Sequence, residues 1–139
     1  MSNKSFTILF AEDDPDDRQL LLEAFSTIDA TLYLHMVEDG KSALAYLEAS
    51  ADPDLPCLIV LDYNMPELSG AEVLKHICGD ERYNKIPKVV LSTSDAPDYV
   101  QECLKYGADK YLVKPTSFGK LVSIARELLE WCALVNHNK

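Results

Sequence analysis

Residues 58–66 read LIVLDYNMP: four consecutive apolar residues, then an aspartate, then a loop. A short run that is apolar at every position is typical of a strand buried on both faces. Such strands occur in parallel sheets that have helices packed on both sides. The stretch therefore predicts the central strand of a parallel α/β sheet, with Asp62 at its carboxyl end.

Four further strands are expected, two before this one at residues 6–11 and 31–37 and two after it at residues 89–91 and 111–113. Segments with apolar residues at helical spacing separate them, and the last of these helices should begin near Ser117. Asp14 before Pro15 predicts a capped helix start, whereas the polar segment 79–85 predicts an exposed loop. Strands alternating with helices in this way predict a doubly wound α/β fold, with a five-stranded parallel sheet and helices on both faces.

The length and charge of the chain limit what it can do. Its 139 residues carry 13 Lys and Arg against 23 Asp and Glu, a net charge of −10, and show no linker or repeat. We expect one domain over residues 1–139 with no output domain after it. The acidic balance argues against nucleic acid and anionic membrane as partners, because phosphate contacts need cations.

No targeting or membrane signal is visible in the sequence. The longest apolar runs are far too short to span a bilayer, and the first residues lack the apolar stretch of a signal peptide. The four cysteines stand far apart without a C-x-x-C pair, which favours buried, reduced thiols over a zinc site or a disulfide framework. We expect a cytoplasmic protein.

Polar residues follow the predicted strands at the points where each strand ends. Glu12 and Asp13 follow the first strand, Asp62 the third, Ser92 the fourth and Lys114 the fifth. Because ligands of open parallel sheets bind beyond the carboxyl ends of the strands, we expect these side chains to meet. Crowded carboxylates need a cation, and hard oxygen ligands suit Mg²⁺. With Asp62 as nucleophile, the site is suited to moving a phosphoryl group onto or off an aspartate.

These motifs, together with Met65-Pro66 and Gly70 after Asp62 and with Pro115 after Lys114, resemble the receiver domain of two-component response regulators, the CheY-like family. The resemblance covers nearly the whole chain, and the intervals from Asp62 to Ser92 and to Lys114 also match the family. It implies a flavodoxin-like sheet with the strand order 2-1-3-4-5.

The resemblance also implies a role for each matched position. Asp62 would be the modified residue, which accepts a phosphoryl group from a phosphohistidine, and it would share Mg²⁺ with Glu12, Asp13 and the backbone carbonyl of Asn64. The other implied catalytic residues are Lys114, which would pair with one phosphoryl oxygen, and Ser92, which would bind another.

Ser92 and Tyr111 would together form the switch, and the Lys114–Pro115 peptide would be cis. The sequence departs from the commonest family pattern where Glu12 replaces an aspartate and where Ser92 replaces a threonine. The implied partners are a sensor histidine kinase or a phosphotransfer protein, and an unknown downstream protein. A longer loop at residues 79–85 suggests the receivers that are paired with phytochrome-type kinases, and a weak homodimer is expected by analogy.

Two other functions stay open at this point. A Mg²⁺-dependent phosphohydrolase with an aspartyl nucleophile usually carries a second catalytic aspartate two residues on, where this chain has Asn64. It also needs a substrate-binding cap, for which there is no spare length. An unphosphorylated scaffold of the same fold should have lost part of the acidic set or the lysine, and here both are present.

Overall fold

A five-stranded parallel sheet forms the centre of the computed structural model, which describes residues 7–137, with side chains up to residue 133. Its strands run in the order β2-β1-β3-β4-β5. They are β1 (Thr7–Ala11), β2 (Tyr33–Val37), β3 (Leu58–Asp62), β4 (Lys88–Ser92) and β5 (Lys110–Val113). The predicted fold and the strand order implied by the resemblance are both confirmed. Phe6, expected in the first strand, lies outside the described residues.

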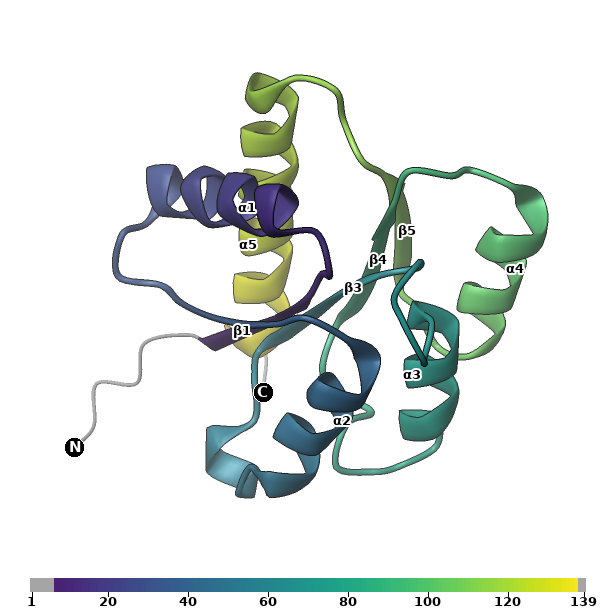
Figure 1. The fold of residues 1–139 in the computed structure, drawn as a ribbon. Helices are drawn as coiled ribbons and strands as arrows, with labels where there is room; N and C mark the ends of the chain where they lie inside the picture. Colours follow the sequence, from purple (N-terminus) through teal and green to yellow (C-terminus); the bar gives the residue numbers. More distant parts are fainter. Residues whose placement is uncertain (1–6, 138–139) are drawn as a thin grey trace.

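Helices cover both faces of this sheet (Figure 1). They are α1 (Pro15–Ile28), α2 (Gly40–Ala49), α3 (Gly70–Ile77), α4 (Pro97–Lys105) and α5 (Phe118–His137), and a short 3-10 helix, η1 (Asp52–Asp54), follows α2. The helices α1 and α5 pack on one face, and α2, α3 and α4 lie on the other. Each face has its own apolar core, and the sheet contributes alternate residues to each.

The central position of β3 explains its unbroken apolar sequence. All five residues of β3 are buried, as are all five of β4, because each strand has a neighbour on both sides and helices above and below. The edge strands β2 and β5 are only partly buried. A run that is apolar at every position therefore marks the middle of this sheet.

Side-chain caps fix where the helices begin. The carboxylate of Asp14 accepts hydrogen bonds from the backbone N–H groups of Asp16 and Asp17, as expected for the residue before Pro15. The last helix begins at Phe118, one residue later than expected. Phe118 shares the helical spacing of the apolar residues that follow it, which favours a place in the core, but its side chain is 43% exposed. Its place in the first turn leaves it beyond the sheet that covers the rest of that helix face.

Two local details differ from the prediction. The segment 79–85 is largely the exposed loop that was predicted, but Tyr83 within it is buried, and Arg82 donates to the carboxylate of Asp52 and to the carbonyl of Ser50. The second strand begins two residues later than expected. Asp29 accepts hydrogen bonds from both the backbone and the hydroxyl of Thr31, which holds the chain in a turn there.

The described helices contain no segment with both the length and the apolar character needed to cross a bilayer. Not all four cysteines are buried. Cys103 and Cys132 lie in the core, Cys57 is half-buried and Cys78 is exposed.

Candidate functional site

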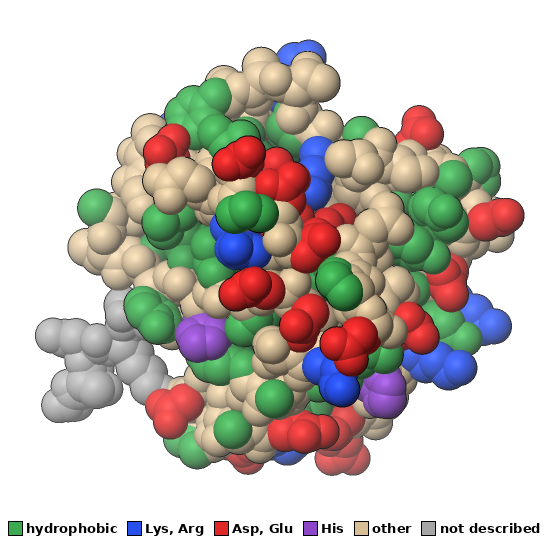
Figure 2. Space-filling model, in the orientation of Figure 1, with side chains coloured by type: hydrophobic (Ala, Val, Ile, Leu, Met, Phe, Trp, Pro, Cys, Tyr) green, Lys and Arg blue, Asp and Glu red, His purple; other side chains and the backbone are tan. Residues whose placement is uncertain are grey.

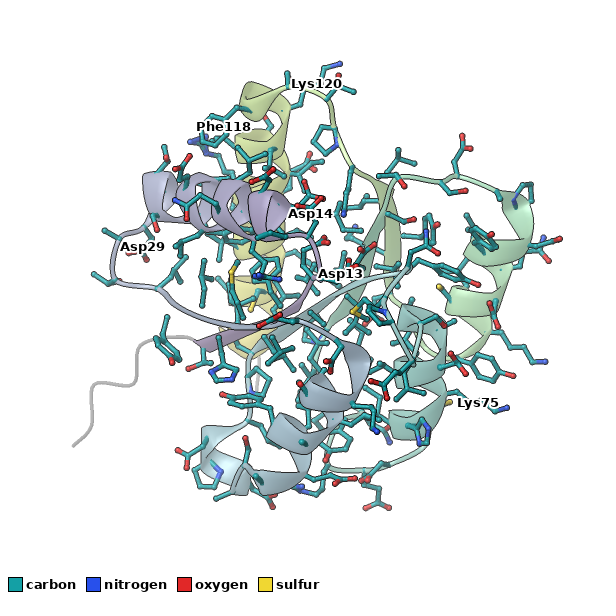
Figure 3. The ribbon with its side chains drawn as sticks, viewed as in Figure 1. Asp13, Asp14, Asp29, Lys75, Phe118 and Lys120 are labelled. Atoms are coloured by element: carbon teal, nitrogen blue, oxygen red, sulfur yellow. The ribbon has the colours of Figure 1, made fainter. Side chains whose placement is uncertain are left out.

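The carboxyl edge of the sheet brings together side chains that lie far apart in the sequence. Glu12 and Asp13 follow β1, Asp62 ends β3, Ser92 ends β4 and Lys114 follows β5. Asp13 lies at the turn between β1 and α1 (Figure 3), and acidic side chains gather over the face that Figure 2 presents. These five residues were predicted to meet at this edge, and the fold places them there.

Three carboxylates form the centre of the site. One oxygen atom from each of Glu12, Asp13 and Asp62 lies within 4.8 Å of the other two. Glu12 is 2% exposed and Asp62 is 7% exposed, whereas Asp13 is open to solvent. The cluster therefore consists of two buried carboxylates and one, that of Asp13, that solvent can reach.

Lys114 supplies the cation nearest to these carboxylates. Its ammonium nitrogen lies 2.7 Å from Oε1 of Glu12, 2.9 Å from Oδ2 of Asp17 and 3.6 Å from Oδ2 of Asp62. Burial works against the charge of Lys114, but the hydrogen bonds to Glu12 and Asp17 outweigh it and raise the pKa of the lysine. Lys114 is therefore a fixed positive charge beside Asp62.

Burial has the opposite effect on the acids. It raises the pKa of Glu12 from 4.5 to about 7, although the hydrogen bond from Lys114 works in the other direction. Burial also raises the pKa of Asp62, and the nearby charge of Lys114 only partly offsets this. One ammonium group is therefore too little positive charge to keep the whole cluster ionised.

The loop after β3 holds Asp62 through close backbone packing. A Cβ atom at Gly70 would lie 2.6 Å from the carbonyl oxygen of Asp62, so only glycine fits at this place. The Gly70 N–H donates to the carbonyl of Tyr63, and the Asn64 N–H donates to Oδ1 of Asp62 at 3.4 Å. Glu67 adopts a left-handed backbone conformation with φ of 68°, which turns the loop back toward α3.

Ser92 and Tyr111 lie beside this centre on neighbouring strands. The Ser92 side chain is fully buried, and its hydroxyl oxygen accepts a hydrogen bond from the Ser94 N–H. The Tyr111 hydroxyl donates to the Ser94 carbonyl at 2.6 Å, so both residues contact the β4–α4 loop. The peptide before Pro115 is trans, as is every other one within residues 7–137, so the cis bond implied by the resemblance is absent. The trans form is the intrinsically favoured one at X-Pro bonds.

Two groups of contacts were not predicted from the sequence. Asp17 was missed as a partner of Lys114, although it lies in the first turn of α1, which starts at the same edge of the sheet. The Tyr63 ring stacks on the ring of Tyr99, with 4.3 Å between the ring centroids, and its hydroxyl donates to the carboxylate of Glu102. The loop that follows Asp62 therefore contacts α4. No spacing rule indicates this second contact, because it joins two elements distant in sequence.

The residues of the cluster fit a divalent cation. All the available donors are oxygens, two of the carboxylates are buried with raised pKa values, and Asp13 leaves one side accessible to water. Hard cations prefer this set of ligands, and a second positive charge would offset the repulsion between the carboxylates.

Comparison with known proteins agrees with this geometry. The family model described as the response regulator receiver domain matches residues 8–126. The "Probable methanogenesis regulatory protein FilR2" of Methanothrix harundinacea is 35% identical over 128 residues, which cover 91% of this chain and 83% of that protein. The two-component response regulator ARR7 of Arabidopsis thaliana is 36% identical over 113 residues, but these cover 73% of this chain and only 55% of that protein.

Solved structures show the same fold. The phosphorylated cyanobacterial phytochrome response regulator RcpA superposes with a TM-score of 0.83 at 31% identity, covering 92% of this chain and 94% of that one. The Mn²⁺-bound form of response regulator Rcp1 superposes with a TM-score of 0.77 at 31% identity, covering 88% of this chain and 91% of that one. A structural relative therefore carries a divalent cation, which agrees with the acidic cluster seen here.

Proposed function

The chain belongs to the response regulator receiver domain family, and from this premise we propose that Asp62 is the residue that accepts the phosphoryl group. Receiver domains act in two-component systems and take their phosphoryl group from histidine kinases. The chain is thus a signalling module that takes part in its own phosphorylation, rather than a conventional enzyme. We propose that the described residues act as one receiver domain.

The proposed reaction is an in-line displacement at phosphorus. A carboxylate oxygen of Asp62 attacks the phosphorus of a phosphohistidine, the P–N bond breaks, and the imidazole nitrogen leaves with the electron pair. The product is an acyl phosphate on Asp62. The buried position of Asp62 at the end of β3 supports this role, because the backbone packing of Gly70 and the hydrogen bond from Asn64 fix the carboxylate in place.

Charge neutralisation is the main requirement of such a transfer. A divalent cation, which we propose to be Mg²⁺, would neutralise charge on the phosphoryl oxygens when bound. Glu12, Asp13, Asp62 and the carbonyl of Asn64 would hold it. Lys114, whose ammonium group already lies 3.6 Å from Asp62, would pair with one phosphoryl oxygen, and the Ser92 hydroxyl would bind another.

The proposed output is a change in one protein face. Ser92 would move toward the phosphoryl group, and Tyr111, which bonds to the same β4–α4 loop, would follow it. Large apolar side chains are exposed on α4 and β5 at Leu104 and Val113. Phosphorylation would shift the population of this face toward the form that a downstream protein binds.

The same proposal includes the partners of the chain. We propose a histidine kinase of the phytochrome type, because the first of the similar structures is a phytochrome response regulator; a phosphotransfer protein could supply the same phosphohistidine. A cytoplasmic location and a weak homodimer through the last helices or strands complete the proposal. The net charge of −10 supports a protein partner rather than nucleic acid or an anionic membrane.

The two alternatives have less support. An aspartyl phosphohydrolase usually carries its second catalytic aspartate two residues after the nucleophile, but this chain has Asn64 there, with its N–H bonded to Asp62. An inactive scaffold would need no close group of three carboxylates and a lysine, and this group is intact.

One observation carries the proposal: the ammonium group of Lys114 and the oxygens of Glu12 and Asp13 surround the buried carboxylate of Asp62. The test is intact mass after incubation with acetyl phosphate, with and without Mg²⁺, for the wild type and Asp62→Asn. We expect the wild type to gain one phosphoryl group only with Mg²⁺ and the variant to gain none. Steady turnover of small phosphate esters would favour the hydrolase instead, and no modification would favour the scaffold.

A further inference from the structure

The ammonium group of Lys114 is shared unequally among its carboxylate neighbours. Glu12 and Asp17 lie within hydrogen-bond distance at 2.7 and 2.9 Å, whereas Asp62, at 3.6 Å, lies just beyond it. An ammonium group has three N–H donors, so two are already used by residues other than the proposed phosphoacceptor. The unmodified structure therefore holds Lys114 back from Asp62.

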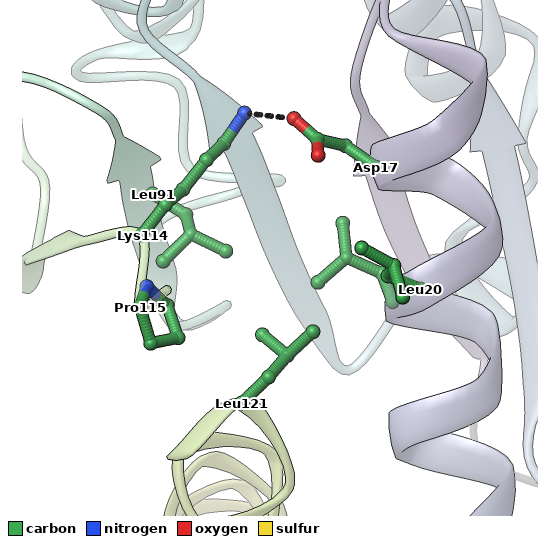
Figure 4. A pocket seen from close by; sticks show the side chains of 7 residues that line it. Asp17, Leu20, Leu91, Lys114, Pro115 and Leu121 are labelled. Atoms are coloured by element: carbon green, nitrogen blue, oxygen red, sulfur yellow. Dashed lines mark hydrogen bonds and ion pairs between the residues drawn. The ribbon is translucent and has the colours of Figure 1, made fainter. Parts of the chain in front are cut away.

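The surroundings of the Lys114 side chain limit where its charge can go. The aliphatic part of the lysine lines a small pocket with Leu91, Pro115 and Leu121, and its nitrogen reaches across to Asp17 on α1 (Figure 4). The lysine side chain is only 14% exposed. Because the stem packs against these apolar groups, the charged end is held close to its carboxylate partners.

Asp17 is the replaceable partner of the two. Glu12 is buried, and its second oxygen accepts a hydrogen bond from the Asp14 N–H, so its carboxylate is held from both sides. The Asp17 side chain is 33% exposed, so water can hydrate its carboxylate when the lysine leaves. Asp17 also lies outside the three-carboxylate cluster that fits a divalent cation.

We propose that Asp17 is a positioning residue that competes with the phosphoryl group for Lys114. In the unmodified protein it draws the ammonium group toward α1 and keeps it beyond hydrogen-bond distance of Oδ2 of Asp62. A phosphoryl group on Asp62 would have to draw Lys114 away from Asp17 before it could bind the lysine fully. Asp17 thus weakens the binding of the phosphoryl group by Lys114. Phosphorylation of Asp62 would also break the contact between Lys114 and the start of α1. This inference rests on the proposed role of Asp62 as phosphoacceptor.

The test uses beryllofluoride, an anion that binds aspartate carboxylates as a phosphoryl mimic, titrated calorimetrically into the full chain at saturating Mg²⁺. We expect Asp17→Asn to bind it about 3- to 10-fold more tightly than the wild type, as expected for the loss of one partly exposed, charge-assisted competitor. Asp17→Ser, which suits a first helical turn, should behave alike if Asn disturbs the helix start.

Asp16→Asn is the matched control. Asp16 carries the same charge in the same turn of α1 but does not contact Lys114, so we expect its affinity to stay within about twofold of the wild type. In a Lys114→Met background, Asp17→Asn should change the affinity for beryllofluoride no more than Asp16→Asn does. If Asp17 acts only through Lys114, removing the lysine removes its effect.

The outcomes separate the two levels of the argument. If the wild type binds beryllofluoride but Asp17→Asn binds no more tightly than Asp16→Asn, the role of Asp17 is wrong. If the gain persists in the Lys114→Met background, the effect does not pass through the lysine, and the inference fails as well. If the wild type binds no beryllofluoride at all with Mg²⁺, the proposed function itself is contradicted.

Discussion

At the scale of single residues, the site is governed by a shortage of positive charge. Glu12 and Asp62 are buried side by side, and Lys114 is the cation that the fold places next to both. Burial raises the pKa of both acids, which shows that the lysine offsets the cost of their charges only in part. A divalent cation that joins these carboxylates would therefore lower both pKa values at once.

We expect the stability of the metal-free protein to depend on pH through Glu12. Between pH 4.5 and about 7, Glu12 keeps a proton in the folded state that the unfolded chain has released. The stabilisation from this raised pKa is therefore complete below pH 4.5 and is lost as the pH rises through about 7. Relative to Glu12→Gln, the wild type in EDTA should lose on the order of 3 kcal/mol of unfolding free energy across this range.

Urea unfolding of both proteins at a series of pH values measures this difference. Saturating Mg²⁺ is the internal control, because a bound cation favours the ionised carboxylate and should remove the slope. An equal pH dependence for the two metal-free proteins would contradict the account of Glu12.

At the scale of elements, the β3–α3 loop depends on one glycine. A methyl group at Gly70 would meet the carbonyl oxygen of Asp62 at 2.6 Å, so Gly70→Ala must displace either α3 or the end of β3. We expect it to destabilise the fold by about 2 kcal/mol or more and to slow phosphorylation of Asp62.

Gly119→Ala is the matched control for this loop. A Cβ at Gly119, in the first turn of α5, would have nothing within 4 Å, so alanine there should be neutral or slightly stabilising. Denaturation curves and acetyl phosphate labelling of both variants provide the measurement. Equal effects of the two substitutions would show that the close approach at Gly70 is unimportant.

A buried lysine holds the segment before β4 in place. The Lys88 ammonium group donates to the carbonyls of Tyr83 and Ile86, and burial lowers the pKa of Lys88. Lys88→Met keeps the length of the side chain but leaves both carbonyls without this donor, so we expect a loss of about 1–3 kcal/mol. The exposed Lys85→Met should change stability by less than about 0.5 kcal/mol in the same thermal melts, and a neutral Lys88→Met would argue against this anchor.

At the scale of the whole molecule, the metal site should couple to global stability. A cation that binds only the folded chain stabilises it by about 2.7 kcal/mol at a free concentration 100 times its Kd. We therefore expect Mg²⁺ to raise the Tm of the wild type by several degrees, and Asp13→Asn to lose most of that increment. Asp16→Asn, outside the cluster, should keep it. A Tm that Mg²⁺ does not change would count against a cation at this edge of the sheet.

The architecture was predictable because its signals are local. The unbroken apolar run before Asp62 identified the central strand, and the rule that ligands gather beyond strand ends placed Glu12, Asp13 and Lys114 around it. The strand order itself came from the family resemblance, since right-handed crossovers leave several orders open.

What the sequence left out depends on packing between distant elements. The contact of Asp17 with Lys114 requires the orientation of α1 over β5, and the burial of Tyr83 requires the apolar core under α2 and α3. Phe118 fits the helical period of its neighbours, yet the sheet does not extend far enough to cover it. Periodicity identifies the apolar face of a helix but not the length of the surface that it packs against.

The central claim is that Asp62 carries the phosphoryl group, and direct mapping of the modified residue tests it most closely. The chain is incubated with acetyl phosphate and Mg²⁺, the acyl phosphate is reduced with borohydride to homoserine, and the digest is sequenced by mass spectrometry. We predict homoserine at position 62, and none there when Mg²⁺ is replaced by EDTA. Homoserine at Asp13 or another carboxylate, or labelling of Asp62 that does not depend on the cation, would contradict the account.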